Sequence, residues 1–275
     1  MLTLINANRM TPPIAPVGLD YVAAAAREAG IEVEVVDLAL AEDADSALHS
    51  YFASARPALV GVSFRNVDDS FWPSGQWFVP ELRSLVESLR PLTGAPIVLG
   101  GVGFSILADR VLDFAGADYG IRGDGERAVV ELYRQLPTGR LDRVPGLIRR
   151  LGGRLVANPP AWQSPLSVPA ARDAVDNPAY FRLGGQVGLE TKRGCPRQCL
   201  YCADPVAKGP AVRARPPAEV ADEAEALLAR GVDVLHLCDG EFNVPRDHAT
   251  AVCEEFARRG LGRRLRWYTY AIISP

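Results

Sequence analysis

Short apolar runs and longer amphipathic segments alternate along the first half of the chain. The short runs predict five strands, at residues 1–7, 31–38, 59–64, 96–99 and 117–121. The longer segments predict helices, at residues 17–29, 43–56, 78–89, 107–114 and 124–136. Such alternation favours a parallel sheet with helices on both faces. We therefore expect residues 1–137 to form an α/β domain with a Rossmann-like, doubly wound sheet.

The second half continues the alternation with fewer elements. Strands are predicted at residues 186–191, 232–238 and 264–273, and helices at 217–230 and 248–259. This order opens a parallel (β/α) barrel, but six units of ~30 residues each need about twice the length present. We therefore expect residues 185–275 to form the N-terminal part of a (β/α) barrel, apparently truncated.

The segment between the two halves, residues 138–184, has a different pattern. Two strand-like runs, 144–150 and 154–157, flank Gly152-Gly153 and predict a hairpin. Residues 158–184 have no hydrophobic period, and prolines such as those between Ser164 and Pro169 disfavour regular structure. We expect a hairpin followed by an irregular linker.

Composition excludes several classes of protein. The 275 residues are 48% hydrophobic and 23% charged, with a net charge of −3, so no global field favours nucleic acid or an anionic membrane. No apolar run is long enough to span a bilayer, and the N-terminus lacks the basic region of a signal peptide. Five cysteines, an odd number, favour a reducing compartment, and we expect the protein in the cytoplasm, without nucleic-acid or membrane partners.

Three of the five cysteines form a compact motif. Cys195, Cys199 and Cys202 have the spacing C-x3-C-x2-C. Three thiolates on a short loop can hold three irons of a four-iron, four-sulfur (4Fe–4S) cluster and leave the fourth iron open. The alternative is a zinc site, but the sequence lacks the second ligand pair that such a site usually needs. Cys238 is expected to be a buried thiol, and Cys253 a core residue of a helix.

The segments that follow the predicted strands form a second candidate site. In a doubly wound sheet, ligands bind beyond the carboxyl ends of the strands, and here those segments are polar or rich in glycine. The turn Gly100-Gly101-Val102-Gly103 would let the backbone approach a flat or bulky group closely. It lacks the third glycine of a dinucleotide fingerprint. Ordinary βα turns without a ligand are the alternative.

The cysteine loop resembles the signature loop of the radical S-adenosylmethionine (radical SAM) enzymes. Residues 1–136 resemble the cobalamin-binding domain that precedes many radical SAM cores, through Pro16-Val17-Gly18-Leu19, the turns at Ser63 and Gly100-Gly101, and segment 116–126. The chain thus resembles the cobalamin-dependent, class B type radical SAM enzymes. The resemblance implies three cofactors: a 4Fe–4S cluster, S-adenosylmethionine and cobalamin. It implies these cobalamin-binding residues: Asn8, Ser63, Arg65, Asn66, Gly100, Gly101, Gly103, Phe104, Gly123 and Glu126.

One departure from the cobalamin-binding pattern concerns the cobalt ligand. Many such domains carry D-x-H-x-x-G, in which the histidine binds cobalt from below. If Gly18 is the glycine of that motif, Pro13 and Ala15 stand at the positions of Asp and His. The resemblance then implies cobalamin bound without a histidine ligand. Arg65 is a candidate to face the lower side of the cobalt, and a salt bridge to Asp68 or Asp69 is the alternative.

The resemblance also assigns roles around the cysteine loop. Cys195, Cys199 and Cys202 would bind the cluster, and Tyr201 would lie against the adenine of S-adenosylmethionine. Asp239-Gly240-Glu241 stands where a G-G-E motif holds the methionyl amine, with Asp in place of the first glycine. Arg213 or Arg215 could meet the carboxylate of S-adenosylmethionine, and solvated surface charges are the alternative for both.

The implied activity is methyl transfer from methylcobalamin to a poorly activated carbon through a 5′-deoxyadenosyl radical. One alternative is a rearrangement or cyclisation without methyl transfer. Another is a truncated cobalamin- and cluster-binding module that is inactive alone. The implied partners are a small-molecule or peptide substrate, an electron donor such as flavodoxin or ferredoxin, and a chain that supplies the missing barrel strands. Phe71, Trp72 and Trp77 are expected to cover the corrin or a substrate, or else to pack within the fold.

Overall fold

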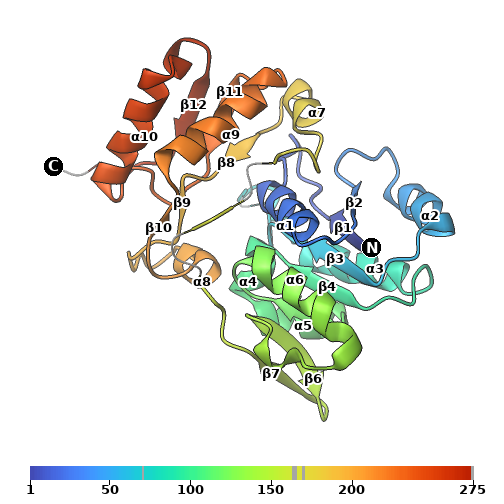
Figure 1. Ribbon diagram of the computed structural model, residues 1–275. Helices are drawn as coiled ribbons and strands as arrows, with labels where there is room; N and C mark the ends of the chain where they lie inside the picture. Colours follow the sequence, from blue (N-terminus) through green and yellow to red (C-terminus); the bar gives the residue numbers. More distant parts are fainter. Residues whose placement is uncertain (70, 163–165, 169–170, 274–275) are drawn as a thin grey trace. The chain divides into compact units, whose positions relative to one another are not determined.

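The computed structural model describes residues 1–69, 71–162, 166–168 and 171–273 (Figure 1). Two compact units make up these residues. The first contains Met1–Met10 and Val22–Trp162, and the second contains Thr11–Tyr21 with the chain that follows Trp162. Each unit has its own sheet.

A seven-stranded sheet forms the centre of the first unit. Its order is β2 (Val33–Asp37), β1 (Leu2–Asn6), β3 (Leu59–Ser63), β4 (Ile97–Gly100), β5 (Tyr119–Ile121), β6 (Leu147–Leu151) and β7 (Arg154–Ala157). The first five strands are parallel, which confirms the predicted doubly wound sheet. Because β1 lies between β2 and β3, the winding direction of the chain reverses at the β1–β3 neighbours. A ligand is expected beyond the carboxyl ends of strands at such a switch point.

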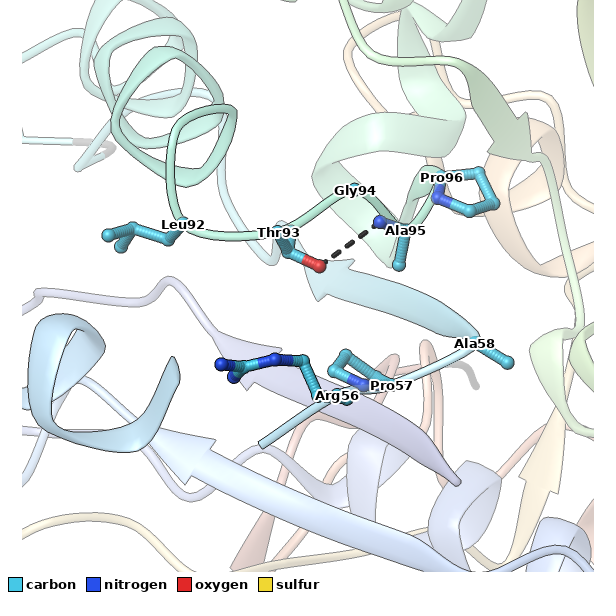
Figure 2. Close-up of a pocket in the computed structure, with 8 residues that line it drawn as sticks. All are labelled: Arg56, Pro57, Ala58, Leu92, Thr93, Gly94, Ala95 and Pro96. Carbon is cyan, nitrogen blue, oxygen red and sulfur yellow. Dashed lines mark hydrogen bonds between the residues drawn. The ribbon is translucent and has the colours of Figure 1, made fainter. Parts of the chain in front are cut away.

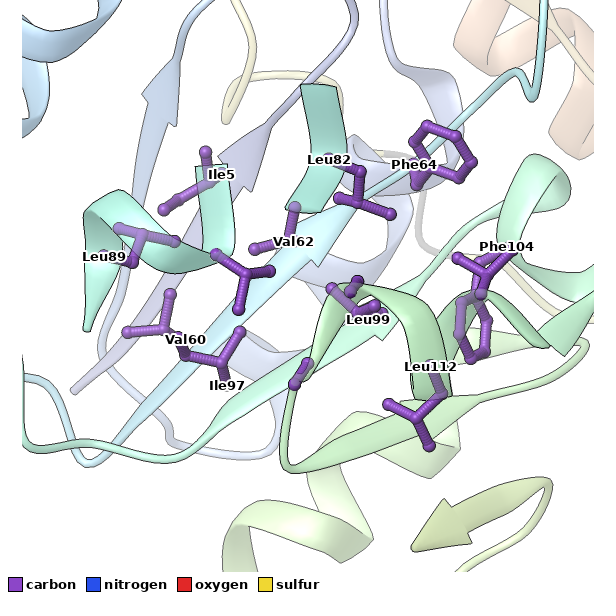
Figure 3. Close-up of a cluster of buried hydrophobic side chains, with 14 of the residues drawn as sticks. Ile5, Val60, Val62, Phe64, Leu82, Leu89, Ile97, Leu99, Phe104 and Leu112 are labelled. Atoms are coloured by element: carbon purple, nitrogen blue, oxygen red, sulfur yellow. The ribbon is translucent and has the colours of Figure 1, made fainter. Parts of the chain in front are cut away.

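Helices cover both faces of this sheet. They are α1 (Val17–Glu28), α2 (Ala44–Ser54), α3 (Val79–Leu89), α4 (Val102–Ile106), α5 (Ala108–Ala115) and α6 (Gly125–Gln135), and 3₁₀ turns follow at Leu136–Thr138 and Leu141–Arg143. On one face, Val60, Val62 and Leu99 pack against Leu82 of α3 and Leu112 of α5 (Figure 3). On the other, α1 and α6 are neighbours, because Arg134 of α6 donates a hydrogen bond to the carbonyl of Ala29.

The hairpin at the end of the first unit lies in its sheet. Strand β6 pairs antiparallel with β5, and β7 pairs with β6. Leu147 and Ile148 are fully buried by this pairing. The hairpin therefore extends the seven-stranded sheet of the first unit. The sequence pattern had placed it in a connecting segment outside that domain.

A smaller parallel sheet forms the centre of the second unit. Its order is β12 (Arg266–Thr269), β11 (Val234–Leu237) and β8 (Gly188–Leu189), and the helices α9 (Pro217–Ala229) and α10 (Arg246–Arg258) connect its strands. A 3₁₀ turn at Leu261–Arg263 precedes β12. Three parallel strands with helical crossovers are the predicted opening of a (β/α) barrel. All three strands are shorter than predicted, because each begins two residues later and ends one to four residues earlier than the sequence pattern indicated.

A two-stranded ribbon closes the base of the cysteine loop. Residues Lys192–Arg193 (β9), which the sequence pattern placed just past the first strand, pair antiparallel with Arg213–Ala214 (β10). The short helix α8 (Asp204–Lys208) lies between them in sequence. The cysteines are therefore carried on a loop whose two ends are joined by backbone hydrogen bonds.

One helix in the linker was missed. Helix α7 spans Asn177–Arg182, and the side chain of its N-cap residue, Asp176, accepts a hydrogen bond from the Ala179 amide. Half of the run from Ser164 to Pro169 lies outside the described residues, and residues 166–168 have no regular secondary structure. In the part of the chain that the structure describes, no helix is long and apolar enough to cross a membrane.

Candidate functional site

The carboxyl ends of three neighbouring strands form one row, which includes two of the predicted cobalamin-binding residues. Asn6 of β1 lies opposite Ser63 of β3, which in turn lies opposite Gly100 of β4. Beyond β1, the amide of Asn8 donates to Asn6 Oδ1 at 3.2 Å, and the amide of Met10 donates to Asn8 Oδ1 at 3.1 Å. These two turns bury both asparagines and fix the loop at the switch point.

Two glycines after β4 are required by the chain itself. A Cβ at Gly101, whose φ is +100°, would lie 2.6 Å from the carbonyl oxygen of Phe64. A Cβ at Gly103 would lie 2.8 Å from the amide nitrogen of Asn66. The space above these two glycines is therefore filled by the backbone after β3. Because these glycines have no side chain, the segment after β4 can pack against the segment after β3. The sequence pattern had suggested that the same space is left for a ligand.

Phe104 is a core residue. Its side chain is fully buried, and its ring packs where a Cβ of Gly120 would be. A ligand could therefore meet Phe104 only through its backbone, because the short helix α4 turns the ring into the sheet. Figure 3 shows the ring among the core side chains.

Ser105 and Trp162 make contacts at this rim to which the sequence pattern assigned no role. Ser105 Oγ donates to the carbonyl of Gly101 at 2.9 Å and accepts from the amide of Gly123 at 3.1 Å, so it joins the turns after β4 and β5. A Cβ at Gly123 would lie 2.8 Å from Trp162 Cζ3. No local periodicity indicates the two contacts with Gly123, because Ser105 and Trp162 lie far from it in the sequence.

Arg65 and Asn66 are tied to one another after β3. Arg65 Nη1 donates to Asn66 Oδ1 at 2.6 Å, and both residues are half-buried. Glu126, in the first turn of α6, is buried. Phe71 and Trp72, in the loop after β3, are 61% and 96% exposed. A packing role is therefore wrong for these two aromatic residues in this structure.

A surface depression of about 520 Å³ lies at the opposite edge of the same sheet (Figure 2). Its lining residues precede β3 and β4: Arg56, Pro57, Ala58, Leu92, Thr93, Gly94, Ala95 and Pro96. The Arg56 guanidinium is already bonded to the carbonyls of Phe52 and Ala55 at the end of α2. The predicted ligand residues follow the strands, so this depression is separate from the candidate site.

In the second unit, the cysteine loop begins at a glycine that a residue with a side chain cannot replace. Gly194 has φ +82°, and a Cβ there would overlap the carbonyl oxygen of Ala211. The amide of Cys195 donates to the carbonyl of Gly209 at 3.1 Å, and the amide of Cys202 donates to the carbonyl of Cys199 at 3.1 Å. Cys195 is buried, Cys199 is half-buried and Cys202 is exposed, and all are free thiols.

The thiols do not form a site for a single ion. Among the described residues, no group of three or more His, Cys, Asp or Glu side chains is placed to hold one metal ion. Zinc would need its ligands about 2.3 Å from one point. A 4Fe–4S cluster holds its irons apart, so its thiolates need not meet at a point, and three free cysteines on one loop fit it.

The Asp239-Gly240-Glu241 turn lies against this loop. A Cβ at Gly240 would lie 2.5 Å from Asp204 Oδ2 and 3.9 Å from Cys195 Cβ. The Asp239 carboxylate is already bonded within the chain, because it accepts hydrogen bonds from Thr191 and Lys192. Tyr201 is 90% exposed and is thus accessible to a ligand.

The alternative of solvated surface charges is wrong for both arginines. Arg213 and Arg215 are 3% and 1% exposed. Arg213 Nη2 donates to the carbonyl of Lys208 at 2.6 Å. Arg215 is ion-paired with Glu223 at 2.7 Å and donates to the carbonyl of Glu190. Arg215 therefore belongs to the interior, and Arg213 stays the candidate for a carboxylate.

The two cysteines outside the loop differ from one another. Cys238 is half-buried, its thiol donates to the carbonyl of Leu189, and burial raises its pKa to about 12. The thiol is therefore protonated at neutral pH, although Cys238 is half-buried where the sequence predicted a buried residue. Cys253 is exposed, so its assignment to the core is wrong; it lies on the outer side of α10. Nearby, His236 stacks on Tyr268 with ring centroids 4.8 Å apart.

A buried ionic cluster in the second unit was also missed. Arg172 pairs with Asp20 at 2.8 Å and with Glu223 at 2.6 Å, and all three side chains are at most 1% exposed. The hydroxyl of Tyr21 donates to Glu223 at 2.8 Å, and burial together with Glu223 raises the pKa of Tyr21 well above its usual value. Residues 20–21, 172 and 223 are thus joined in one network.

Two family models match the chain. The B12 binding domain matches residues 4–133, and the Radical SAM superfamily matches residues 189–273. The first match spans β1 to α6, and the second spans the cysteine loop and the three-stranded sheet.

The tryptophan 2-C-methyltransferase of Streptomyces laurentii is 34% identical over the whole chain, which covers 56% of that protein. The hopanoid C-3 methylase of Methylococcus capsulatus is 25% identical over 90% of the chain, which covers 47% of it. The chain thus spans about half the length of these curated relatives.

Solved structures give the same result. The radical S-adenosylmethionine methyltransferase TsrM from Kitasatospora setae, solved with cobalamin and a 4Fe–4S cluster bound, matches with a TM-score of 0.90 at 35% identity. The match covers all of this chain and 55% of that one. OxsB, a cobalamin-dependent S-adenosylmethionine radical enzyme, has the same fold over 94% of the chain, with a TM-score of 0.75 at 19% identity. This chain has a B12-binding domain followed by the first part of a radical SAM core, and it is homologous to the cobalamin-dependent radical SAM methyltransferases.

Proposed function

We propose that this chain is the cofactor-binding part of a radical SAM methyltransferase that moves a methyl group from cobalamin to a poorly activated carbon. When bound, the cluster with S-adenosylmethionine would supply a 5′-deoxyadenosyl radical, and cobalamin would supply the methyl group. The chain spans about half of its curated relatives, so the complete activity is proposed for this chain together with whatever completes the barrel.

The observation that carries this proposal is the apposition of Gly240 and Cys195. A Cβ at Gly240 would lie 3.9 Å from Cys195 Cβ, although 44 residues separate the two in the sequence. A turn that can offer carbonyl oxygens to an ammonium thus lies beside a three-cysteine loop. Cys195, Cys199 and Cys202 would hold the cluster, Tyr201 would contact the adenine, and Arg213 would meet the carboxylate of S-adenosylmethionine.

The cobalamin site is proposed at the switch point of the first unit. Its side-chain contacts would come from Asn8, Ser63, Arg65, Asn66 and Glu126, and its backbone contacts from Gly100 and Gly123. Gly101 and Gly103 would act indirectly, because they let the turn after β4 pack on Phe64 and Asn66. Arg65 would face the lower side of the cobalt, where the sequence provides no histidine.

The proposed substrate is a small molecule. Tryptophan is the first compound to test, because a relative 34% identical to this chain is a tryptophan 2-C-methyltransferase. A low-potential donor such as flavodoxin or ferredoxin would reduce the cluster, and a partner segment would supply further barrel strands. The five free thiols support a cytoplasmic location.

The test is anaerobic reconstitution of the chain, together with the segment that completes the barrel, with iron, sulfide and cobalamin. An assay with S-adenosylmethionine, a reductant and tryptophan follows. We expect a methylated product together with 5′-deoxyadenosine and S-adenosylhomocysteine. A methylated product with S-adenosylhomocysteine alone would refute the radical step. An isomerised substrate without added methyl would support the rearrangement alternative, and a protein that binds neither cluster nor cobalamin would overturn the proposal.

A further inference from the structure

The turn that follows β11 is held to the base of the cysteine loop by a buried ion pair. We propose that Asp239 and Lys192 are positioning residues, which aim the backbone carbonyls of Asp239 and Gly240 at the ammonium of S-adenosylmethionine. This inference rests on the proposed function, because it concerns the same ligand. It also explains why aspartate can stand at a position where the related motif has glycine.

The Asp239 carboxylate is saturated by its own chain. It accepts from the Thr191 amide at 2.8 Å, the Thr191 hydroxyl at 2.5 Å, the Lys192 amide at 3.2 Å and the Lys192 ammonium at 3.1 Å. Both side chains of the ion pair are at most 2% exposed. A carboxylate has about four lone-pair sites, and these four donors occupy them. The side chain of Asp239 therefore has no capacity left for a ligand.

Lysines hold the two ends of the turn. Lys192 Nζ also donates to the carbonyl of Glu241 at 2.6 Å, and Lys208 Nζ donates to the carbonyl of Cys238 at 3.2 Å. These are the two lysines among the 30 basic residues of the sequence. A compact ammonium can reach a carboxylate and a carbonyl at one corner, which the planar fork of arginine does less well. The carbonyls that remain between the two anchors are those of Asp239 and Gly240.

Loss of Asp239 would leave several donors without an acceptor. With glycine or asparagine at this position, the buried Lys192 ammonium would lose its counter-charge, and breaking one partner of a buried pair is costly. The turn would then be free to shift relative to Thr191 and Lys192, which lie directly before the cysteine loop. A shift of the turn misplaces the two carbonyls without removing any cluster ligand.

The contact itself is tested without any cofactor. Hydrogen–deuterium exchange of the Asp239→Asn variant should be faster than wild type at residues 191–192 and 238–242, with little change in the first unit. Asp247→Asn is the matched control, since Asp247 is an exposed residue of α10 in the same unit. Unchanged exchange in the Asp239→Asn variant would refute the attachment of the turn to Thr191 and Lys192 through Asp239, which we call the clamp.

The role of the clamp is tested in reconstituted protein. Asp239→Asn and Lys192→Met should keep wild-type iron and sulfide but bind S-adenosylmethionine about tenfold to a hundredfold more weakly, as expected for loss of a charged hydrogen bond. The electron paramagnetic resonance signal of their reduced cluster should respond less to S-adenosylmethionine. Since the two residues act through one another, the double variant should bind no more weakly than the weaker single variant.

The outcomes separate the two proposals. If wild type binds S-adenosylmethionine and Asp239→Asn binds it equally well, or if the two single effects simply add, the positioning role is wrong and the proposed function stands. If the single variants lose iron in proportion to affinity, the pair is structural and the positioning role is again wrong. If reconstituted wild type binds no S-adenosylmethionine, the proposed function falls and this role with it, even where exchange establishes the clamp.

Discussion

The carbonyl oxygen of Phe64 lies 2.6 Å from the point where a Cβ of Gly101 would stand. The φ of Gly101, +100°, is also unfavourable for any residue with a side chain. The Gly101→Ala variant should therefore lose about 1–3 kcal/mol of unfolding free energy, from overpacking and backbone strain. Urea unfolding measures this loss. Wild-type stability in this variant would contradict the packing described after β4.

Gly100→Ala separates packing from ligand contact. A Cβ at Gly100 would meet its nearest neighbour, the carbonyl oxygen of Ile121, at 3.9 Å, an ordinary contact. We expect this variant to have the same free energy of unfolding as wild type but to bind cobalamin more weakly. The reason is that the added methyl group would occupy space at the proposed cobalamin site. Cobalamin retention after gel filtration measures the difference. Full retention would move the ligand away from Gly100.

Single substitution of the loop cysteines should abolish the cluster. Cys195→Ala, Cys199→Ala and Cys202→Ala should each lose most of the iron and sulfide after anaerobic reconstitution, because three thiolates are the minimum that holds three irons. Cys253→Ala is the matched control, since its thiol is exposed on α10 and distant in sequence from the loop. Equal iron loss in the control, or retention in all three loop variants, would refute the assignment.

Cys238 should resist alkylation at neutral pH. Burial raises its pKa to about 12, so almost no thiolate is present, whereas Cys253 is exposed. Iodoacetamide treatment of cofactor-free protein followed by peptide mapping should label Cys253 well before Cys238. Prompt labelling of Cys238 would show that the carboxyl end of β11 opens in solution.

The same pKa predicts a dependence of stability on pH. A raised pKa in the folded state stabilises the fold fully below the ordinary thiol pKa of about 8.5. That stabilisation is lost as pH rises from there towards about 12. The difference in unfolding free energy between wild type and Cys238→Ala should therefore shrink over this range. A constant difference would indicate that the thiol is more accessible than in the structure.

Arg172→Met should destabilise the second unit strongly. The substitution removes the partner of two fully buried carboxylates, Asp20 and Glu223. Breaking a buried ion pair on one side costs about 3–5 kcal/mol. Arg83→Met is the control, because Arg83 and Glu87 form an exposed pair on α3 that contributes about 0.2–1 kcal/mol. Similar small losses in both variants would show that the buried cluster relaxes or admits water.

The sequence pattern succeeded where the signal is local. Alternation of apolar runs and amphipathic segments predicted five parallel strands and the start of a barrel, because each strand and helix must bury its own apolar face. It failed at element ends, such as β8, which is reduced to Gly188–Leu189. There the chain leaves the sheet for hydrogen bonds with Asp239, 48 residues away. Cys253 was misplaced for a related reason: a small apolar residue near the edge of a helix face carries little information on burial.

By itself, the sequence indicated the family, the doubly wound first sheet and the C-x3-C-x2-C motif, because short spacings and periodic patterns carry that information. Only the tertiary structure decided which charges meet. Asp20 and Arg172 are 152 residues apart, and Lys192 and Asp239 are 47 apart. Such pairs depend on the path of the backbone between them. A charged residue buried with its partner has no local pattern that distinguishes it from one in water.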